Sequence, residues 1–259
     1  MDNRISAIIL TKNSQNTIID CLESVLFCDE IIIVDDNSSD NTLDLVSSFK
    51  RKSLNVYKRN LENDFSSQRN FALSKVNTKW AIFVDSDEVV TRELMEKIKK
   101  VLSVDLYDGY YIKRVDYIWG KKLIHGETGA INLLRMAKVK NGAWVGKVHE
   151  SWKVSGSISN IDQELMHFPH QSVAEFISEI DYYTTLRAEE LCTLGVKANW
   201  FLIIMYPFSK FFLNYFLRLG FLDGVHGFVS AIIMSGHSFL VRAKLFQLQK
   251  KKFKPAELS

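Results

Sequence analysis

A short apolar run that ends in acidic residues limits the possible fold of this chain more than any other part of its sequence. Trp80 to Val84 has the length of a buried strand, and Asp85-Ser86-Asp87-Glu88 follows it directly. Acids at the carboxyl end of a strand lie at the rim of an open α/β sheet, where such folds bind ligands. An Asp-x-Asp pair there can hold a divalent cation that also takes phosphate oxygens. The same acids could instead cap a helix that follows Thr91.

Strands and helices alternate over roughly the first hundred residues. The pattern predicts strands at 5–10, 31–34, 54–57 and 80–84, and helices at 18–26, from 42 onward, at 66–76 and at 92–102. We therefore expect an α/β fold, a doubly wound and mostly parallel sheet, within a domain of residues 1–170. Parallel strands would bring Asp35 and Asp36 to the same edge as Asp85 and Asp87, which favours the metal–phosphate interpretation over the helix cap. The sequence has no glycine-rich phosphate-binding motif, so acids and a metal would have to hold any nucleotide.

Four segments, in this order along the chain, carry a resemblance to a known family. They are Ile8–Asn13, Ile32–Thr42, Ser67–Leu73 and Phe83–Glu88. These segments resemble the family 2 glycosyltransferases, which have the GT-A fold, a Rossmann-like sheet, and invert the anomeric centre of a nucleotide sugar. The resemblance therefore implies a transferase that takes its hexose from a UDP-sugar.

Five later segments narrow the resemblance to a subgroup. They are Gly109–Ile112, Ile124–Gly126, Leu134-Arg135, Trp144–Glu150 and Gly220–Gly224. They are similar to β-1,4-glucosyltransferases of lipopolysaccharide core assembly, which add glucose from UDP-glucose to an inner-core heptose. The chain departs from that subgroup at Thr128–Ile131, where the subgroup carries Trp-Tyr-Pro-Asp. Another lipid-linked glycan, such as a capsule or O-unit precursor, is the alternative acceptor.

The resemblance also implies roles for individual residues at the strand ends. The UDP-sugar would contact Thr11, Asn13, Asp35, Asp36, Arg69, Asp85 and Ser86, and the cation, Mg²⁺ or Mn²⁺, would bind Asp85, Asp87 and His149. Asp36 would accept hydrogen bonds from uracil, with Thr11 as a wall of the base site. The alternatives are a turn-forming aspartate at Asp36 and a solvated helix arginine at Arg69.

An inverting transfer needs one base that takes the proton of the acceptor hydroxyl. Glu150 is our first candidate and Glu127 our second, because the family places this carboxylate downstream of the metal motif. Glu150 could instead be a strand-edge residue paired with Lys147, and His149 could orient it rather than bind metal. A hydrogen-bonded structural role is a further alternative for His149. His167 and His170 flank Pro169, where we expect loop residues, with a role in the site as the alternative.

The last third of the chain, residues 171–259, reads as a helical region rich in aromatic residues. Pro207, Lys210 and Arg218 interrupt it, so we expect no uninterrupted apolar run of the roughly 18–20 residues that a spanning helix needs. Aromatic faces beside the lysines at 250–252 suit a membrane interface with anionic lipid. Core packing, or a dimer interface in a homo-oligomer, would account for the same pattern.

Composition limits which partners and which cellular compartment we expect for this chain. The net charge of +3 gives no reason to expect nucleic acid as a partner. Three cysteines without metal-ligand spacing, and no export signal, indicate a reducing compartment. We therefore expect a cytoplasmic enzyme, peripheral on the inner face of the cytoplasmic membrane. The alternative of a catalytically inactive nucleotide- or glycan-binding module is opposed by intact Asp85 and Asp87 together with a downstream carboxylate. A membrane-associated scaffold would leave the acids at two strand ends unexplained.

Overall fold

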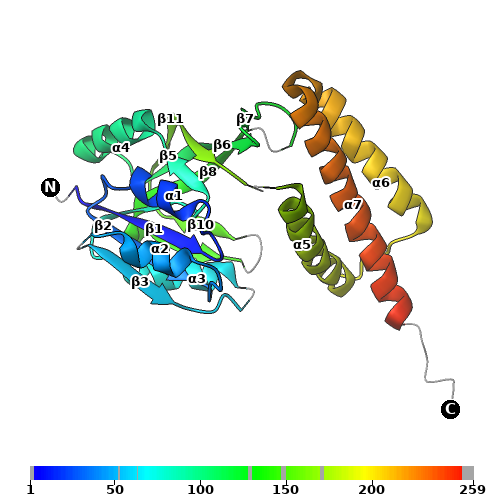
Figure 1. The fold of residues 1–259 in the computed structure, drawn as a ribbon, viewed down its shortest axis with the longest axis horizontal. Helices are drawn as coiled ribbons and strands as arrows, with labels where there is room; N and C mark the ends of the chain where they lie inside the picture. The colour runs from blue at the N-terminus through cyan, green and yellow to red at the C-terminus, as the bar shows by residue number, and fades with distance from the viewer. Residues whose placement is uncertain are drawn as a thin grey trace, which may run out of the picture. The chain divides into compact units, whose positions relative to one another are not determined.

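The computed structural model describes residues 3–51, 53–62, 64–127, 130–146, 150–169 and 172–252. These residues form two compact units (Figure 1). The first unit holds Met1–Val115 and Ile131–Phe168, and the second holds Asp116–Ala130 and Pro169–Ser259.

Strands and helices alternate at the start of the chain, as the sequence predicts. In order they are β1 (Ile5–Thr11), α1 (Ile18–Ser24), β2 (Glu30–Asp35), α2 (Thr42–Ser48), β3 (Leu54–Lys58), α3 (Phe65–Leu73), β4 (Trp80–Phe83), β5 (Glu88–Val90) and α4 (Arg92–Val104). Strands then dominate: β6 (Gly109–Ile118), β7 (Lys121–Lys122), β8 (Ala130–Lys138), β9 (Gly142–Val145), β10 (Ser151–Val154) and β11 (Ile158–His167). The helices α5 (Val173–Thr193), α6 (Trp200–Phe212) and α7 (Gly224–Lys252) complete the chain.

The main sheet has a parallel half and a mixed half. Its strand order is β3-β2-β1-β4-β8-β6-β11-β5, with β7 paired to β6. The strands from β3 to β4 run parallel, whereas β8 joins β4 antiparallel and β11 joins β5 antiparallel. The predicted α/β class and its parallel core are confirmed, and the antiparallel extension is what the sequence pattern did not show.

Alternating side chains of the parallel strands enter two different core layers. Ile5, Ala7 and Ile9 of β1 pack with residues of α1, α2 and α4, whereas Ile8 packs with Ala72 of α3. The strand β2 is buried along its whole length, as expected for a parallel strand that is covered on both faces. Helices therefore cover both faces of this half (Figure 1).

The antiparallel pair of β9 and β10 forms a separate two-stranded sheet on the side of α3. Trp144 and Trp152 face each other in register, with their rings stacked at 5.6 Å, and both rings meet Phe83 of β4 edge-on. The side chain of Asn70 fixes β9 to α3, because its amide donates to the Trp144 carbonyl and its carbonyl accepts from the Trp144 N–H, both at 2.8 Å.

The second unit combines the three C-terminal helices with Asp116–Ala130. The Asp223 carboxylate holds this segment, since it accepts hydrogen bonds from the backbone N–H groups of Ile124 and His125. Lys121 Nζ also donates to the Asp223 carbonyl at 2.9 Å. The units thus differ from the predicted domain of residues 1–170, because hydrogen bonds distant in sequence draw Asp116–Ala130 to the helices.

Candidate active site

The carboxyl ends of the parallel strands gather the first group of predicted site residues. Thr11 at the end of β1 pairs in register with Asp35 at the end of β2. The next residue, Asp36, accepts hydrogen bonds from the backbone N–H of Leu61 at 2.8 Å and from Lys12 Nζ at 2.7 Å. The structure brings Thr11, Asp35 and Asp36 together at one sheet edge, and their contact with a nucleotide stays a prediction.

The loops that follow β1, β2 and β4 are tied together by short polar side chains. Asn13 accepts from the Ser39 N–H at 2.8 Å and donates its own N–H to Ser38 Oγ at 2.9 Å. The hydroxyl groups of Ser14 and Ser86 lie 2.8 Å apart. These contacts hold Asn13 and Ser86, two of the predicted binding residues, in fixed loops at the strand ends.

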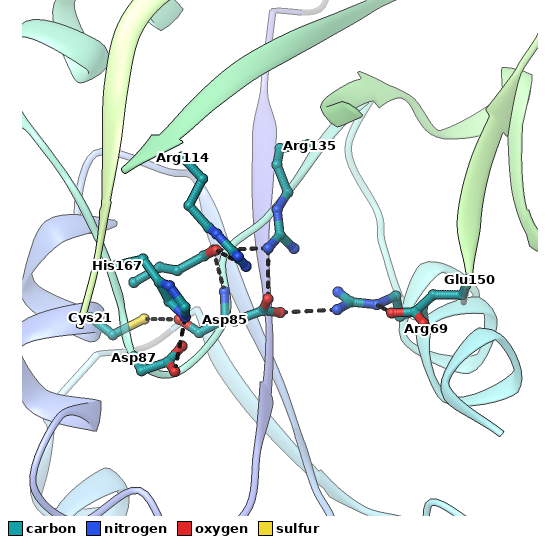
Figure 2. Close-up of polar contacts among 9 residues, drawn as sticks. Cys21, Arg69, Asp85, Asp87, Arg114, Arg135, Glu150 and His167 are labelled. Carbon is teal, nitrogen blue, oxygen red and sulfur yellow. Dashed lines mark hydrogen bonds and ion pairs between the residues drawn. The ribbon is translucent and has the colours of Figure 1, made fainter. Parts of the chain in front are cut away.

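Asp85 lies between two arginine side chains (Figure 2). Arg135 Nη2 donates to Asp85 Oδ2 at 2.7 Å, and Arg69 Nη2 donates to Asp85 Oδ1 at 3.1 Å. Burial raises the pKa of the Asp85 carboxyl, but the charges of Arg135 and Arg69 outweigh burial and hold it well below its usual range. Asp85 is therefore ionised, with both oxygens engaged by arginine.

Glu88 supports this arrangement from inside the protein. Its side chain is fully buried; Oε2 accepts the Asp85 N–H at 2.8 Å, and Oε1 accepts from Arg135 at 2.7 Å. Burial raises the pKa of Glu88 above its usual value. Thr91, rather than one of the acids, caps α4 by accepting the Leu94 N–H. The alternative interpretation of the acids as a helix cap is therefore wrong.

Replacing Arg135 with methionine is expected to destabilise the first unit by about 3 kcal/mol, because two carboxylates would lose their shared cation in a buried position. Urea denaturation would measure this loss. The control is Arg92→Met, which removes an 83% exposed side chain from its pair with Glu96 and should change the free energy of unfolding by less than about 0.5 kcal/mol. Equal small losses in both variants would contradict the assignment of Arg135.

Arg69 joins Asp85 to the first candidate base. Its Nε donates to Glu150 Oε1 at 3.2 Å, and its guanidinium lies over the Trp144 ring at 4.6 Å from the centroid. Arg69 is 7% exposed, so α3 presents it inward, and the alternative of a solvated helix arginine is wrong. The structure thus places Arg69, Asp85 and Glu150 side by side, although they are far apart in sequence (Figure 2). The described partner of Glu150 is Arg69, and Lys147 lies outside the described residues.

A cavity of about 570 Å³ opens beside these residues, large enough for part of a sugar nucleotide. Arg69, Asp85 and Glu150 form one part of its wall. Strands β6, β8 and β10 supply polar side chains to the rest, among them Tyr111, Asn132, Ser151 and Lys153, and Ser155 follows directly after β10. Glu150 therefore faces a polar space in which hydroxyl groups could bind.

Asp87 forms a pair with His167 at the same edge of the sheet. Its Oδ2 lies 3.3 Å from His167 Nε2, and 36% of its side chain is exposed. Because β11 pairs antiparallel with β5, His167 stands opposite Glu88 in register, next to Asp87. A carboxylate oxygen and an imidazole nitrogen so close together fit two ligands of a divalent cation. The sequence predicts a loop at His167, but the structure places it at the end of β11, and the pairing of β11 with β5 brings it beside Asp87.

The remaining candidates lie elsewhere. His149 and His170 lie outside the described residues. Glu127 belongs to the second unit, where its carboxylate accepts from Lys210 Nζ at 2.5 Å and from Asn214 at 3.2 Å. Burial raises the pKa of Glu127, but these two partners outweigh burial and lower it. Glu150 lines the cavity beside Asp85, whereas Glu127 is bonded to side chains of the second unit, and this placement favours Glu150 as the base.

Comparisons with known proteins identify the family of the chain. Residues 6–166 match the sequence profile of Glycosyl transferase family 2. The chain is 28% identical to the lipopolysaccharide core biosynthesis glycosyltransferase LpsC of Rhizobium meliloti, across 97% of this chain and 95% of that protein. It is 26% identical to the uncharacterized glycosyltransferase RT0209 of Rickettsia typhi, across 96% and 88%.

A solved structure of Staphylococcus aureus TarS 1–349, in complex with UDP-GlcNAc, is similar to this one. The TM-score is 0.49 and the sequence identity 15%, with 99% of this chain and 94% of that chain covered. The family match itself spans more than half of the sequence, including Asp85, Asp87, Arg135 and Glu150. This chain belongs to glycosyltransferase family 2.

Proposed function

We propose that this glycosyltransferase moves a hexose from a UDP-sugar, with inversion, to a hydroxyl group of a lipid-linked glycan. The similarity to the lipopolysaccharide core biosynthesis glycosyltransferase extends over nearly the whole chain and supports a core acceptor. Glucose onto an inner-core heptose is the specific reaction that we favour. A capsule or O-unit acceptor would use the same chemistry.

The observation that carries the proposal is the bridge that Arg69 makes between Asp85 and Glu150 at the cavity wall. Arg69 Nη1 is buried and has no partner among the described residues, so it remains available to donate to a bound ligand. A guanidinium in that position suits the negative diphosphate of a donor. Glu150 would then lie next to the bond that breaks.

An inverting transfer needs one base for the acceptor hydroxyl and a single displacement at the anomeric carbon of the donor. Glu150 takes the proton of the acceptor hydroxyl, whose oxygen forms the new bond to the anomeric carbon. The bond from that carbon to the UDP oxygen breaks on the opposite face, and its electron pair leaves with UDP. A single displacement of this kind inverts the anomeric configuration. Arg69 orients the Glu150 carboxylate through its 3.2 Å contact with Oε1.

Asp87 and His167 would hold the cation that GT-A glycosyltransferases typically use. Within the described part of the chain, no three His, Cys, Asp or Glu side chains gather as a metal site. These two residues could therefore supply only part of the coordination of Mg²⁺ or Mn²⁺, and donor phosphates and water would complete it. When bound, such an ion neutralises charge on the departing nucleotide. Asp85 could join through lone pairs that its two arginine contacts leave free on the carboxylate oxygens.

A thermal-shift screen of nucleotide sugars tests the donor. With UDP-glucose and Mn²⁺ present at about a hundred times the dissociation constant, we expect the melting temperature to rise by about 5–10 °C. GDP-mannose serves as the control and should give no shift. The matching product assay follows UDP release from UDP-glucose with and without a delipidated heptose acceptor. Stabilisation by GDP-mannose alone would contradict the proposed donor.

A further inference from the structure

The helices α6 and α7 expose apolar side chains where a helix of a soluble protein normally presents polar ones. On α6, the exposed residues recur every three or four positions: Phe201, Met205, Phe208, Phe212 and, in the following turn of π-helix, Phe216. On α7 exposed apolar residues lie three, four or seven positions apart: Val225, Phe228, Ile232, Phe239 and Phe246. By contrast, α4 buries Leu94, Ile98 and Leu102 and leaves its lysines and glutamates outside.

Two segments of this unit are long and apolar enough to cross a membrane, by length and composition alone: Trp200–Leu217 and Gly220–Lys250. Only 6% and 17% of these windows are buried within the chain, so they are not core helices. The expectation that no run would be long enough is therefore corrected. The reason is that α6 continues through Pro207 and that its one charged residue, Lys210, is paired with Glu127.

The charge of α6, α7 and their flanking residues indicates what kind of partner covers their exposed apolar side chains. Residues 196–252 contain eight lysine and arginine residues but a single carboxylate, that of Asp223, which is 3% exposed. Lys210 pairs with Glu127 and Lys244 with Asp181, and the six other cations favour a bilayer that contains anionic lipid over a second copy of the same basic helices. Aromatic side chains beside lysines suit the headgroup region in particular.

Buried polar groups near the turn between the two helices oppose a full crossing. Asp223 holds the backbone of Ile124 and His125, and Glu127 holds Lys210 and Asn214. Passing these charged groups through hydrocarbon would be costly. We infer that the outer faces of α6 and α7, residues 200–252, form a lipid-binding surface that lies in the plane of an anionic membrane and does not span it.

Vesicle flotation tests this surface, and it does not depend on the donor or acceptor. The full chain should float with vesicles of phosphatidylcholine and phosphatidylglycerol, and a wash with alkaline carbonate should release it. Trp200→Ser with Phe208→Ser, at 72% and 71% exposure, should lower the partition coefficient at least tenfold. The matched control is Val104→Ser with Leu106→Ser on the first unit, at 61% and 65% exposure, which should bind as the wild type does.

Changing the lysines at 250–252 to glutamine should weaken vesicle binding more at low salt than at high salt. At high salt, screening already removes the electrostatic attraction between these lysines and anionic lipid. Four outcomes would overturn the inference. A wild type that stays unbound would contradict it, and dissociation of a dimer by the Trp200 and Phe208 changes would assign the surface to a second copy. Equal loss in the control variant would make the effect nonspecific. Retention after the carbonate wash would show that the helices cross the bilayer.

Discussion

Replacing Glu150 with glutamine is expected to slow sugar transfer at least about a hundredfold while donor binding stays near normal. The amide keeps the shape of the side chain and can still accept a hydrogen bond from Arg69 through its carbonyl oxygen. It cannot take a proton from the acceptor hydroxyl. The loss should therefore appear in kcat, measured with acceptor at saturation, while the thermal shift given by UDP-glucose is unchanged.

The control for this variant is Glu127→Gln. Glu127 bonds to Lys210 and Asn214 in the second unit, so its substitution should alter the stability of that unit more than the rate. Circular dichroism melting separates the two effects. A slow Glu127→Gln enzyme beside a fast Glu150→Gln enzyme would reverse the ranking of the two carboxylates.

The parallel half of the fold could be predicted because its signals are local. Strands such as Ile31–Val34 are buried on both faces, so they appear as continuous apolar runs that end at polar loops. The acids follow directly on these strands, and parallel pairing alone brings Asp35 and Asp85 to one edge. The order of the elements was therefore enough to predict this part of the site.

The antiparallel half could not be predicted in the same way. Its strands mix buried, half-buried and exposed side chains without a continuous apolar run, as in β11, and their partners are far away in sequence. Arg135 reaches Asp85 because Met136 of β8 pairs with Ile82 of β4. His167 reaches Asp87 because β11 pairs with β5. A residue that depends on such a register carries no local signal of its role.

Replacing Asp87 with asparagine is expected to abolish transfer and to remove the dependence of donor binding on Mn²⁺. The change deletes a negative charge beside His167 at a position that is partly exposed, so core packing should be unaffected. The primary measurement is the thermal shift given by UDP with and without Mn²⁺, because it reports binding separately from turnover. The wild type should be stabilised more when Mn²⁺ is present, and Asp87→Asn should be stabilised equally in both conditions.

His167→Ala completes this test as a double-mutant cycle. If Asp87 and His167 act on one bound ion, the double variant should lose no more Mn²⁺-dependent stabilisation than either single variant, because residues that share a partner are not additive. Asp44→Asn is the control, since it removes one exposed carboxylate from α2; it should keep the Mn²⁺ effect. Additive losses would mean that the two residues act separately. A fully Mn²⁺-dependent Asp87→Asn enzyme would assign the cation to other residues.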